Sequence, residues 1–220
     1  MMIIDWGIEI YLQDRKPWDR YASFDYCFNY FQDFKNKKDI IAPENIEKSC
    51  LHLWFYLASW GMYRGSSFLL QKSMTPYINL LEVIVGMDEK IWSIDVDTYP
   101  WNDDFILECY GKIKNSLIHD RESHRVLVTK IMLGVFGCIP AFDQYFIKWF
   151  KDICNGNCSF LTVNKQSLSL IYKFYHENRD IIDANAHNTK TLCFNSKEVG
   201  KSYTKAKVID MIGFVHWWNF

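Results

Sequence analysis

The chain has 220 residues, of which 49% are hydrophobic and 23% are charged, and its net charge is -1. These values are typical of globular proteins and exclude an intrinsically disordered chain. The balanced charge also excludes a strongly basic protein, so any binding of nucleic acid must depend on a local patch of surface.

Apolar residues recur at helical spacing along most of the sequence, which predicts an all-α fold in a single domain over residues 1–220 with about eight to ten helices. In residues 17–36 the aromatic residues lie three or four positions apart and define one buried stripe. Residues 43–62 are apolar on every face from Leu51 onward. We therefore expect this second segment to form the central helix.

The rest of the chain shows the same pattern with two interruptions. Residues 87–100 are expected to form a loop or one short turn, and residues 185–203 lack a helical period. A short hairpin near residues 190–203 is the only β-structure that we expect, with a strand at 191–194. Further helices are predicted at residues 74–86, 101–119, 124–137, 140–153, 165–178 and 204–220.

The cysteines and the apolar segments indicate the compartment. The seven cysteines are odd in number and scattered, which does not resemble a disulfide framework. No apolar signal segment follows Met1, and no stretch reaches 18 uncharged apolar residues. We expect a cytoplasmic protein that does not span a membrane.

The turn between Trp60 and Phe68 is the first candidate for binding chemistry. Two glycines flank Arg64, and Ser66 or its neighbour is placed to cap a new helix that begins at Phe68. A helix start beside an arginine favours an anion such as a phosphate. Trp60 and Tyr63 add rings to this predicted substrate site. The alternative is an ordinary helix junction in which Arg64 pairs with an acid of the core.

The second candidate is the pair Lys130 and Asp143. Lys130 lies in the middle of an apolar helix, where an ammonium group needs an acidic partner or a cleft. Asp143 begins the next helix, and the short break at residues 137–140 folds the two helices back on each other. We therefore predict Asp143 and Lys130 as a catalytic pair. The alternatives are a structural ion pair, or an aspartate that only caps its own helix.

Residues 124–150 contain a helix that carries a lysine, a short loop with proline, and an aspartate that enters an aromatic-rich helix. This arrangement resembles the helix-hairpin-helix DNA glycosylases. The resemblance implies an all-α fold in which Asp143 is the catalytic carboxylate beside an extruded nucleotide. The glycine hairpin of that superfamily has no counterpart in residues 121–125, and Lys130 does not occupy the position of its lysine nucleophile.

A basic run near the C-terminus is the candidate DNA contact. One acid, Glu198, interrupts this run, and a solvated loop is the alternative interpretation. The lysines predicted to contact the DNA backbone are Lys190, Lys197, Lys201, Lys205 and Lys207.

No metal site and no cofactor are predicted. Cys154 and Cys158 lack a second pair of ligands at a suitable distance, and no phosphate-binding glycine loop is present.

Three functions therefore fit the sequence. The first is a DNA glycosylase-like enzyme that cleaves the N-glycosidic bond of a normal or modified base, with Asp143 as the catalytic carboxylate. The second is a non-enzymatic helical protein that binds and regulates a protein partner. The third is a helical enzyme that acts on a small anionic substrate, which keeps Arg64 and needs no DNA. The sequence leaves open whether the protein is an enzyme at all.

Overall fold

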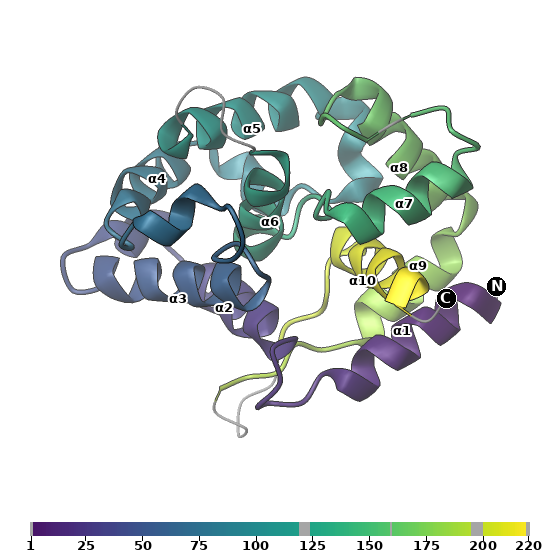
Figure 1. The fold of residues 1–220 in the computed structure, drawn as a ribbon, viewed down its shortest axis with the longest axis horizontal. Coiled ribbons are helices and arrows are strands. Elements are labelled where there is room, and N and C mark those ends of the chain that lie inside the picture. Colours follow the sequence, from purple (N-terminus) through teal and green to yellow (C-terminus); the bar gives the residue numbers. More distant parts are fainter. Residues whose placement is uncertain (1, 119–123, 159, 195–199, 219–220) are drawn as a thin grey trace.

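Helices make up nearly all the regular structure of this computed structural model, which describes residues 2–118, 124–158, 160–194 and 200–218. The predicted all-α fold is confirmed, with ten α-helices and four short 3-10 helices in these residues (Figure 1). The α-helices are α1 Met2–Asp14, α2 Ala22–Asp33, α3 Ile46–Ser59, α4 Pro76–Val85, α5 Asp103–Leu117, α6 Arg125–Phe136, α7 Gln144–Ile153, α8 Lys165–Glu177, α9 Arg179–Asn188 and α10 Lys205–Trp218. The 3-10 helices are η1 Lys37–Ile41, η2 Phe68–Gln71, η3 Glu89–Ser93 and η4 Val96–Trp101.

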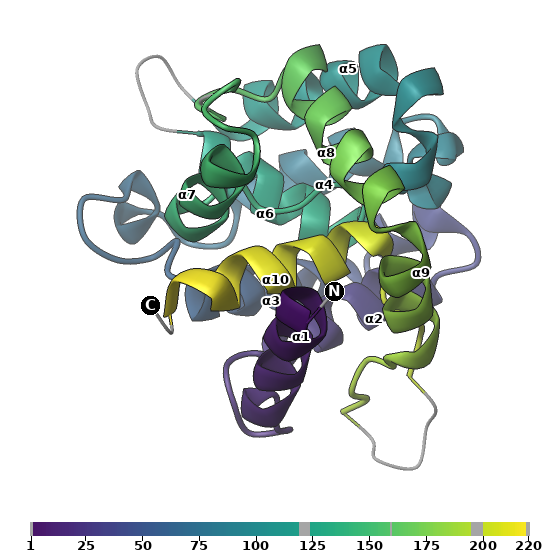
Figure 2. The ribbon, with the colours of Figure 1, turned by 90° about the vertical axis from the view of Figure 1, so that its right-hand side faces the viewer.

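The helices form two groups that meet at the break between α6 and α7. In the first group α2, α3, α4, α5 and α6 pack on one another. In the second group α10 packs against α1, α7 and α9, and α8 packs on η4 and α9. The two ribbon views show α10 crossing this second group between α1 and α7 (Figures 1 and 2). The chain therefore passes from one group to the other immediately before Asp143.

The helix at the centre of the first group is α6, not α3. Every residue of α6 from Leu127 to Phe136 is buried. In α3, by contrast, Leu51 is 38% exposed and Phe55 is 49% exposed, so the expectation that residues 43–62 form the central helix was wrong. Apolar side chains on all faces of a helix do not require neighbours on all faces, because exposed apolar residues are common on protein surfaces.

Two glycines in and after α6 allow close packing. A Cβ atom at Gly134 would overlap the ring of Tyr56 on α3. Gly137 ends α6 in the left-handed conformation with φ of 71°, and its N–H group bonds to the carbonyl groups of Leu133 and Met132. The sharp turn at Gly137 sends the chain into the buried loop of residues 138–142.

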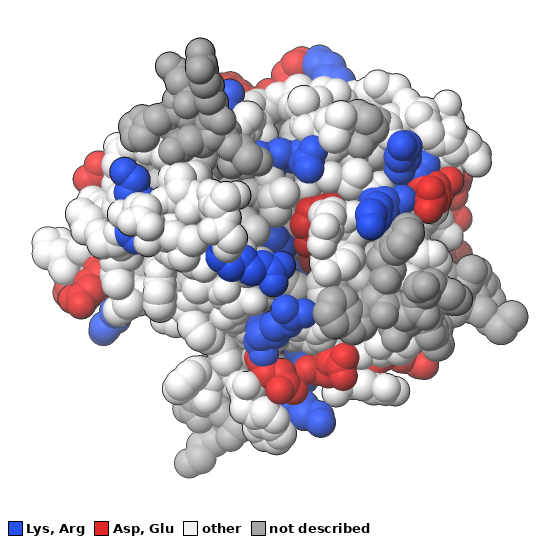
Figure 3. All heavy atoms as spheres, in the orientation of Figure 1, with Lys and Arg blue, Asp and Glu red and all other residues white. Residues whose placement is uncertain are grey.

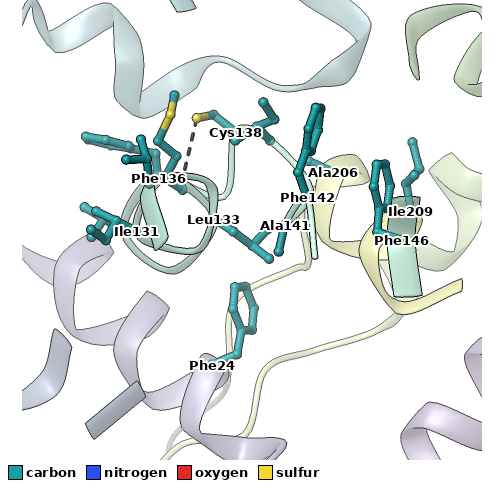
Figure 4. Packing of buried hydrophobic residues seen from close by; sticks show 14 of the residues in the cluster. Phe24, Ile131, Leu133, Phe136, Cys138, Ala141, Phe142, Phe146, Ala206 and Ile209 are labelled. Atoms are coloured by element: carbon teal, nitrogen blue, oxygen red, sulfur yellow. Dashed lines mark hydrogen bonds between the residues drawn. The ribbon is translucent and has the colours of Figure 1, made fainter. Parts of the chain in front are cut away.

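Side chains supply the hydrogen bonds that this buried loop needs. Tyr99 donates to the carbonyl oxygen of Cys138 (2.7 Å), and the N–H group of Ala141 donates to Asp210 (3.0 Å). The N–H group of Phe142 donates to the hydroxyl oxygen of Thr129 (2.9 Å). Figure 4 shows the apolar side chains of this loop among those of α6, α7 and α10. The position of Asp143, the next residue, is therefore fixed by packing and by hydrogen bonds.

Several helix boundaries differ from the predictions. The structure adds α1, which was not predicted, and α2 begins at Ala22 rather than near Pro17. Helix α9 reaches Asn188 in a region that was predicted to be irregular from residue 185. The interval 87–100 contains η3 and most of η4. Polar residues dominate α9, so its apolar period is too weak to predict a helix.

The predicted hairpin near residues 190–203 is reduced to a single antiparallel bridge between Lys190 and Ser202, and residues 191–194 form no strand. The buried carboxylate of Asp25 holds this segment instead. It accepts hydrogen bonds from the N–H group of Leu192 (2.8 Å) and the hydroxyl of Tyr203 (2.6 Å). Burial raises the pKa of Asp25, and the Arg15 guanidinium at 3.0 Å opposes that shift.

Within the described segments, no helix combines the length and the apolar character that crossing a bilayer requires.

The contact between α3 and α6 gives a first prediction. Gly134→Ala forces the Tyr56 ring aside and should lower the free energy of unfolding by about 1–3 kcal/mol. Gly111→Ala on α5 is the matched control, since a Cβ atom there meets nothing within 4 Å. The control should be neutral or stabilising by up to about 1 kcal/mol, because alanine favours helices over glycine. Urea unfolding measures both, and equal effects would contradict the packing described for α6.

The start of α10 gives a second prediction. The carboxylate of Asp95 accepts hydrogen bonds from the N–H groups of Lys205 (2.7 Å), Ala206 (2.9 Å) and Val96 (2.8 Å). Burial nevertheless raises the pKa of Asp95 from 3.8 to about 6. The stability that protonated Asp95 contributes is therefore complete below about pH 4 and is lost as the pH rises through about 6.

The free energy of unfolding of the wild type, measured relative to Asp95→Asn, should fall by up to about 3 kcal/mol between about pH 4 and pH 7. Urea titrations of both proteins across this range measure the difference. The asparagine keeps an oxygen that accepts from the helix but does not titrate. A difference that stays constant with pH would contradict the raised pKa of Asp95.

Candidate functional site

A cavity of about 590 Å³ lies where the two groups of helices meet. The turn after α3, helix α6, the start of α7 and helix α10 all contribute to its wall. Figure 3 shows Lys and Arg side chains gathered around a hollow near the middle of this face. The described residues that line the cavity are Arg20, Trp60, Gly61, Met62, Arg64, Gly65, Ser66, Val126, Lys130, Asp143, Gln144, Tyr145 and Phe214.

Five predicted site residues therefore lie on one cavity although they come from three parts of the chain. They are Trp60, Arg64, Ser66, Lys130 and Asp143. Their shared location leaves the predicted roles untested, but it makes a common ligand physically possible.

Asp143 both caps a helix and faces the cavity. One carboxylate oxygen, Oδ1, accepts from the N–H groups of Tyr145 and Phe146 at the start of α7, both at 3.1 Å. The other, Oδ2, lies 3.2 Å from Nζ of Lys130. The side chain is 17% exposed, so part of the carboxylate can reach a ligand. The predicted ion pair and the predicted helix cap are thus both present.

Lys130 is the only cation of α6 beyond its first residue, and its side chain is 5% exposed. Its ammonium group lies 5.0 Å from the ring centre of Trp60. Among the described residues, Asp143 is its one hydrogen-bond acceptor. An ammonium group has three N–H donors, so Lys130 retains donors for a ligand in the cavity.

Trp60 belongs to a row of stacked rings behind the cavity. Tyr11 stacks on Tyr21 at 4.8 Å, and Tyr21 stacks on Trp60 at 5.5 Å. Phe214 of α10 meets Trp60 edge to face at 5.4 Å, and Tyr145 meets Phe214 at 5.2 Å. The aromatic wall therefore joins α10 to the turn after α3.

Two polar atoms of this row are buried without a hydrogen-bond partner in the described part of the chain: the hydroxyl of Tyr11 and Nε1 of Trp60. Burial raises the pKa of Tyr11 well above its ordinary value, and the carboxylates of Asp25 and Asp210 raise it further. The Tyr11 phenol is therefore neutral, and it acts as part of the scaffold behind the site.

The predicted start of a new element at Phe68 is confirmed, and of the two candidate serines Ser67 caps it. The element is the four-residue 3-10 helix η2, shorter than the helix that was expected. So short a helix has little dipole to offer an anion. Ser66 is exposed and lines the cavity, but it does not cap η2.

Arg64 also differs from the ordinary junction that was the alternative. It is exposed, and it makes no ion pair or hydrogen bond through its side chain with any residue that the structure describes. Its guanidinium lies across Gly61, where a Cβ atom would be 2.6 Å from Nε of Arg64. The turn therefore leaves the Arg64 guanidinium at the cavity wall with all its donors available.

Tyr63 does not belong to the site. Its hydroxyl is hydrogen-bonded to that of Tyr77 (2.6 Å), and its ring packs against Trp54. It is absent from the described lining of the cavity. Its sequence neighbours Met62 and Arg64 line the cavity, whereas Tyr63 connects the turn to α4 through Tyr77.

The lysines of the basic run differ in exposure and in partners. Lys207 is 1% exposed and pairs with Asp210 at 2.9 Å in the core, so its assignment as a DNA contact was wrong. Lys201 pairs with Asp33 (2.6 Å) and Lys205 with Asp97 (3.1 Å).

The remaining two lysines of the run are Lys190 and Lys197. Lys190 is exposed and donates to the hydroxyl oxygen of Ser202 at 2.6 Å, and Lys197 lies outside the described residues.

Two cavity residues, Arg20 and Phe214, were missed from the sequence. Arg20 lies over the rings of Tyr21, Trp60 and Phe214 at 5.3 to 5.9 Å. Its only signal was its place directly before an aromatic stripe. Phe214 lies in a helix that is buried all round, so no period distinguishes its cavity-facing position.

The described residues contain no group of three or more His, Cys, Asp or Glu side chains placed to hold a metal ion. Cys154 and Cys158 are buried free thiols. The chemistry available in the cavity is therefore that of one carboxylate, three cations and several rings.

No family model, curated protein or solved structure matches this chain. Its function must be argued from the cavity itself.

Proposed function

We propose that the cavity binds a nucleotide base and that the protein cleaves the N-glycosidic bond between this base and its sugar. The observation that supports the proposal is the meeting of a carboxylate, a lysine ammonium and aromatic rings, Asp143, Lys130 and Trp60, on one cavity. The proposal keeps the chemistry that the helix-hairpin-helix glycosylase resemblance implies.

The rings and the size of the cavity suit a base. Trp60, Tyr145 and Phe214 all line it, and a planar base is recognised by stacking on such rings. The volume of about 590 Å³ falls within the range of small-molecule sites, roughly 300–1,000 Å³. A base extruded from a duplex or carried by a free nucleotide fits this description.

Asp143 supplies the negative charge for the reaction. When the bond from C1′ to the base nitrogen breaks, its electron pair leaves with the base and positive charge develops on the sugar. The Asp143 carboxylate stabilises this charge or accepts a proton from the water that adds to C1′. The two N–H groups at the start of α7 hold the carboxylate in place for this role.

In this proposal Lys130 acts beside Asp143, at the base end of the bond. Its ammonium group orients Oδ2 of Asp143 and donates to the leaving base, which gains negative charge as the bond breaks. The proton on the released base then comes from the attacking water by way of Asp143, so that water is consumed and base and sugar are the products.

A second candidate is an enzyme that acts on a small anionic substrate in the same cavity. The lysine run favours it, because Lys207 is buried and Lys201 and Lys205 are already paired with acids. A protein that grips duplex DNA needs several phosphate contacts, and its affinity falls steeply with salt. Oligonucleotide binding that resists salt, or is absent, favours this second candidate.

The central prediction concerns Asp143→Asn. The amide keeps an oxygen that caps α7 but carries no charge, so base release should fall by about 100-fold or more while substrate binding changes little. Release of uracil, hypoxanthine and the four common bases from oligonucleotides and from free nucleotides is measured by chromatography. The control is Asp152→Asn, an exposed position on the same helix. The proposed function is refuted if Asp143→Asn still releases the base at the wild-type rate. It is also refuted if the wild-type protein releases no base from any of these substrates.

A comparison of two buried lysines separates catalysis from scaffolding. Lys130→Met removes a cavity-lining ammonium and should lower base release by about tenfold or more at a modest cost in stability. Lys207→Met removes an equally buried ammonium, 5.5 Å from the Trp60 ring, that does not line the cavity. It leaves Asp210 unpaired in the core and should mainly lower the free energy of unfolding.

Urea unfolding and the turnover of the folded fraction are measured for both variants. If Lys130→Met loses only stability, the Lys130–Asp143 pair is structural.

A further inference from the structure

The described wall of the cavity carries more positive than negative charge. Arg20, Arg64 and Lys130 are cationic, and Asp143 is the one carboxylate among the described lining residues. Two positive charges therefore remain in excess. Like charges held around one cavity repel each other unless an anion compensates them.

Arg20 is fixed in position but not neutralised. Its guanidinium lies 5.7 Å from the ring centre of Trp60 and 5.9 Å from that of Phe214. These rings hold the flat face of the group, and its side chain makes no ion pair with the described residues. The N–H donors in the plane of the guanidinium therefore remain available.

Arg64 lies on the turn after α3, which lines the same cavity. Gly61 has a φ of 77°, and the Arg64 guanidinium covers the place that a side chain at Gly61 would occupy. No described acid neutralises it. Two guanidinium groups without counter-ions thus line the same cavity as Lys130, whose ammonium group is already paired with Asp143.

We infer that Arg20 and Arg64 form a phosphate subsite for a phosphomonoester, so that the substrate is a free nucleoside monophosphate rather than a phosphodiester of DNA. This inference rests on the proposed function, because it names the substrate class of that reaction. Guanidinium groups bind phosphate oxygens through paired hydrogen bonds. A phosphomonoester carries a charge of about -1.5 to -2 near neutral pH, which matches the excess of two, whereas a diester carries one charge.

The surroundings of the cavity agree with a small phosphorylated ligand. Three of the five lysines predicted to hold a DNA backbone, Lys201, Lys205 and Lys207, are paired with acids. The guanidinium groups of Arg20 and Arg64, which have no ion pair with the described residues, both line the cavity. One phosphate in the cavity can therefore meet both charges.

The test measures binding without turnover. Isothermal titration calorimetry on the wild type uses ribose 5-phosphate, which has no base to lose, and its phosphate methyl ester, which carries one charge less. Ribose 5-phosphate should bind with a dissociation constant about tenfold or more below that of the ester. Arg20→Gln and Arg64→Gln should each weaken ribose 5-phosphate binding about tenfold. Arg179→Gln, an exposed arginine on α9 away from the cavity, should not.

Equal affinity for the two ribose compounds, or arginine variants that bind ribose 5-phosphate as the wild type does, would overturn the phosphate subsite. Arg20 and Arg64 are exposed, so their variants should fold, and urea unfolding verifies this. Base release from oligonucleotides without discrimination between the ribose compounds refutes the inference and leaves the proposed function standing. Discrimination between the ribose compounds without base release from any nucleotide refutes the proposed function and leaves only the phosphate subsite standing.

Discussion

The ion pair between Asp143 and Lys130 is the interaction on which the arrangement of the site depends. Lys130 is buried in the central helix α6, where an unpaired ammonium would be strongly destabilising. Its partner Asp143 is the N-cap residue of α7. The contact of 3.2 Å between them therefore joins the two groups of helices where they meet. The same contact places a charged pair at the wall of the cavity that lies at this junction.

The buried loop before Asp143 shows why this pair can hold its geometry. Residues 138–142 are buried, and their backbone groups bond to side chains from α6, η4 and α10. Among these partners is Asp210, which also holds the ammonium of Lys207. The carboxylate in the core thus holds the chain at Ala141, two residues before the carboxylate at the cavity.

Local patterns in the sequence predicted the helices and the lysine–aspartate pair, because both depend on residues close together in the chain. A single cation in an apolar helix followed by an acid at the next helix start was enough to place Lys130 near Asp143. Arg20 and Phe214 could not be found in this way, since only tertiary packing brings them to Trp60. The lysine run was misread for a related reason: Lys207 looks like a surface residue until α10 is known to be buried on every side.

A crystal structure of Asp143→Asn with a bound nucleoside 5′-monophosphate would test the account most directly. We expect the base to lie against Trp60, with the glycosidic carbon facing residue 143 and the phosphate in reach of Arg20 and Arg64. A nucleotide bound elsewhere, or one in the cavity with its sugar turned away from residue 143, would contradict it.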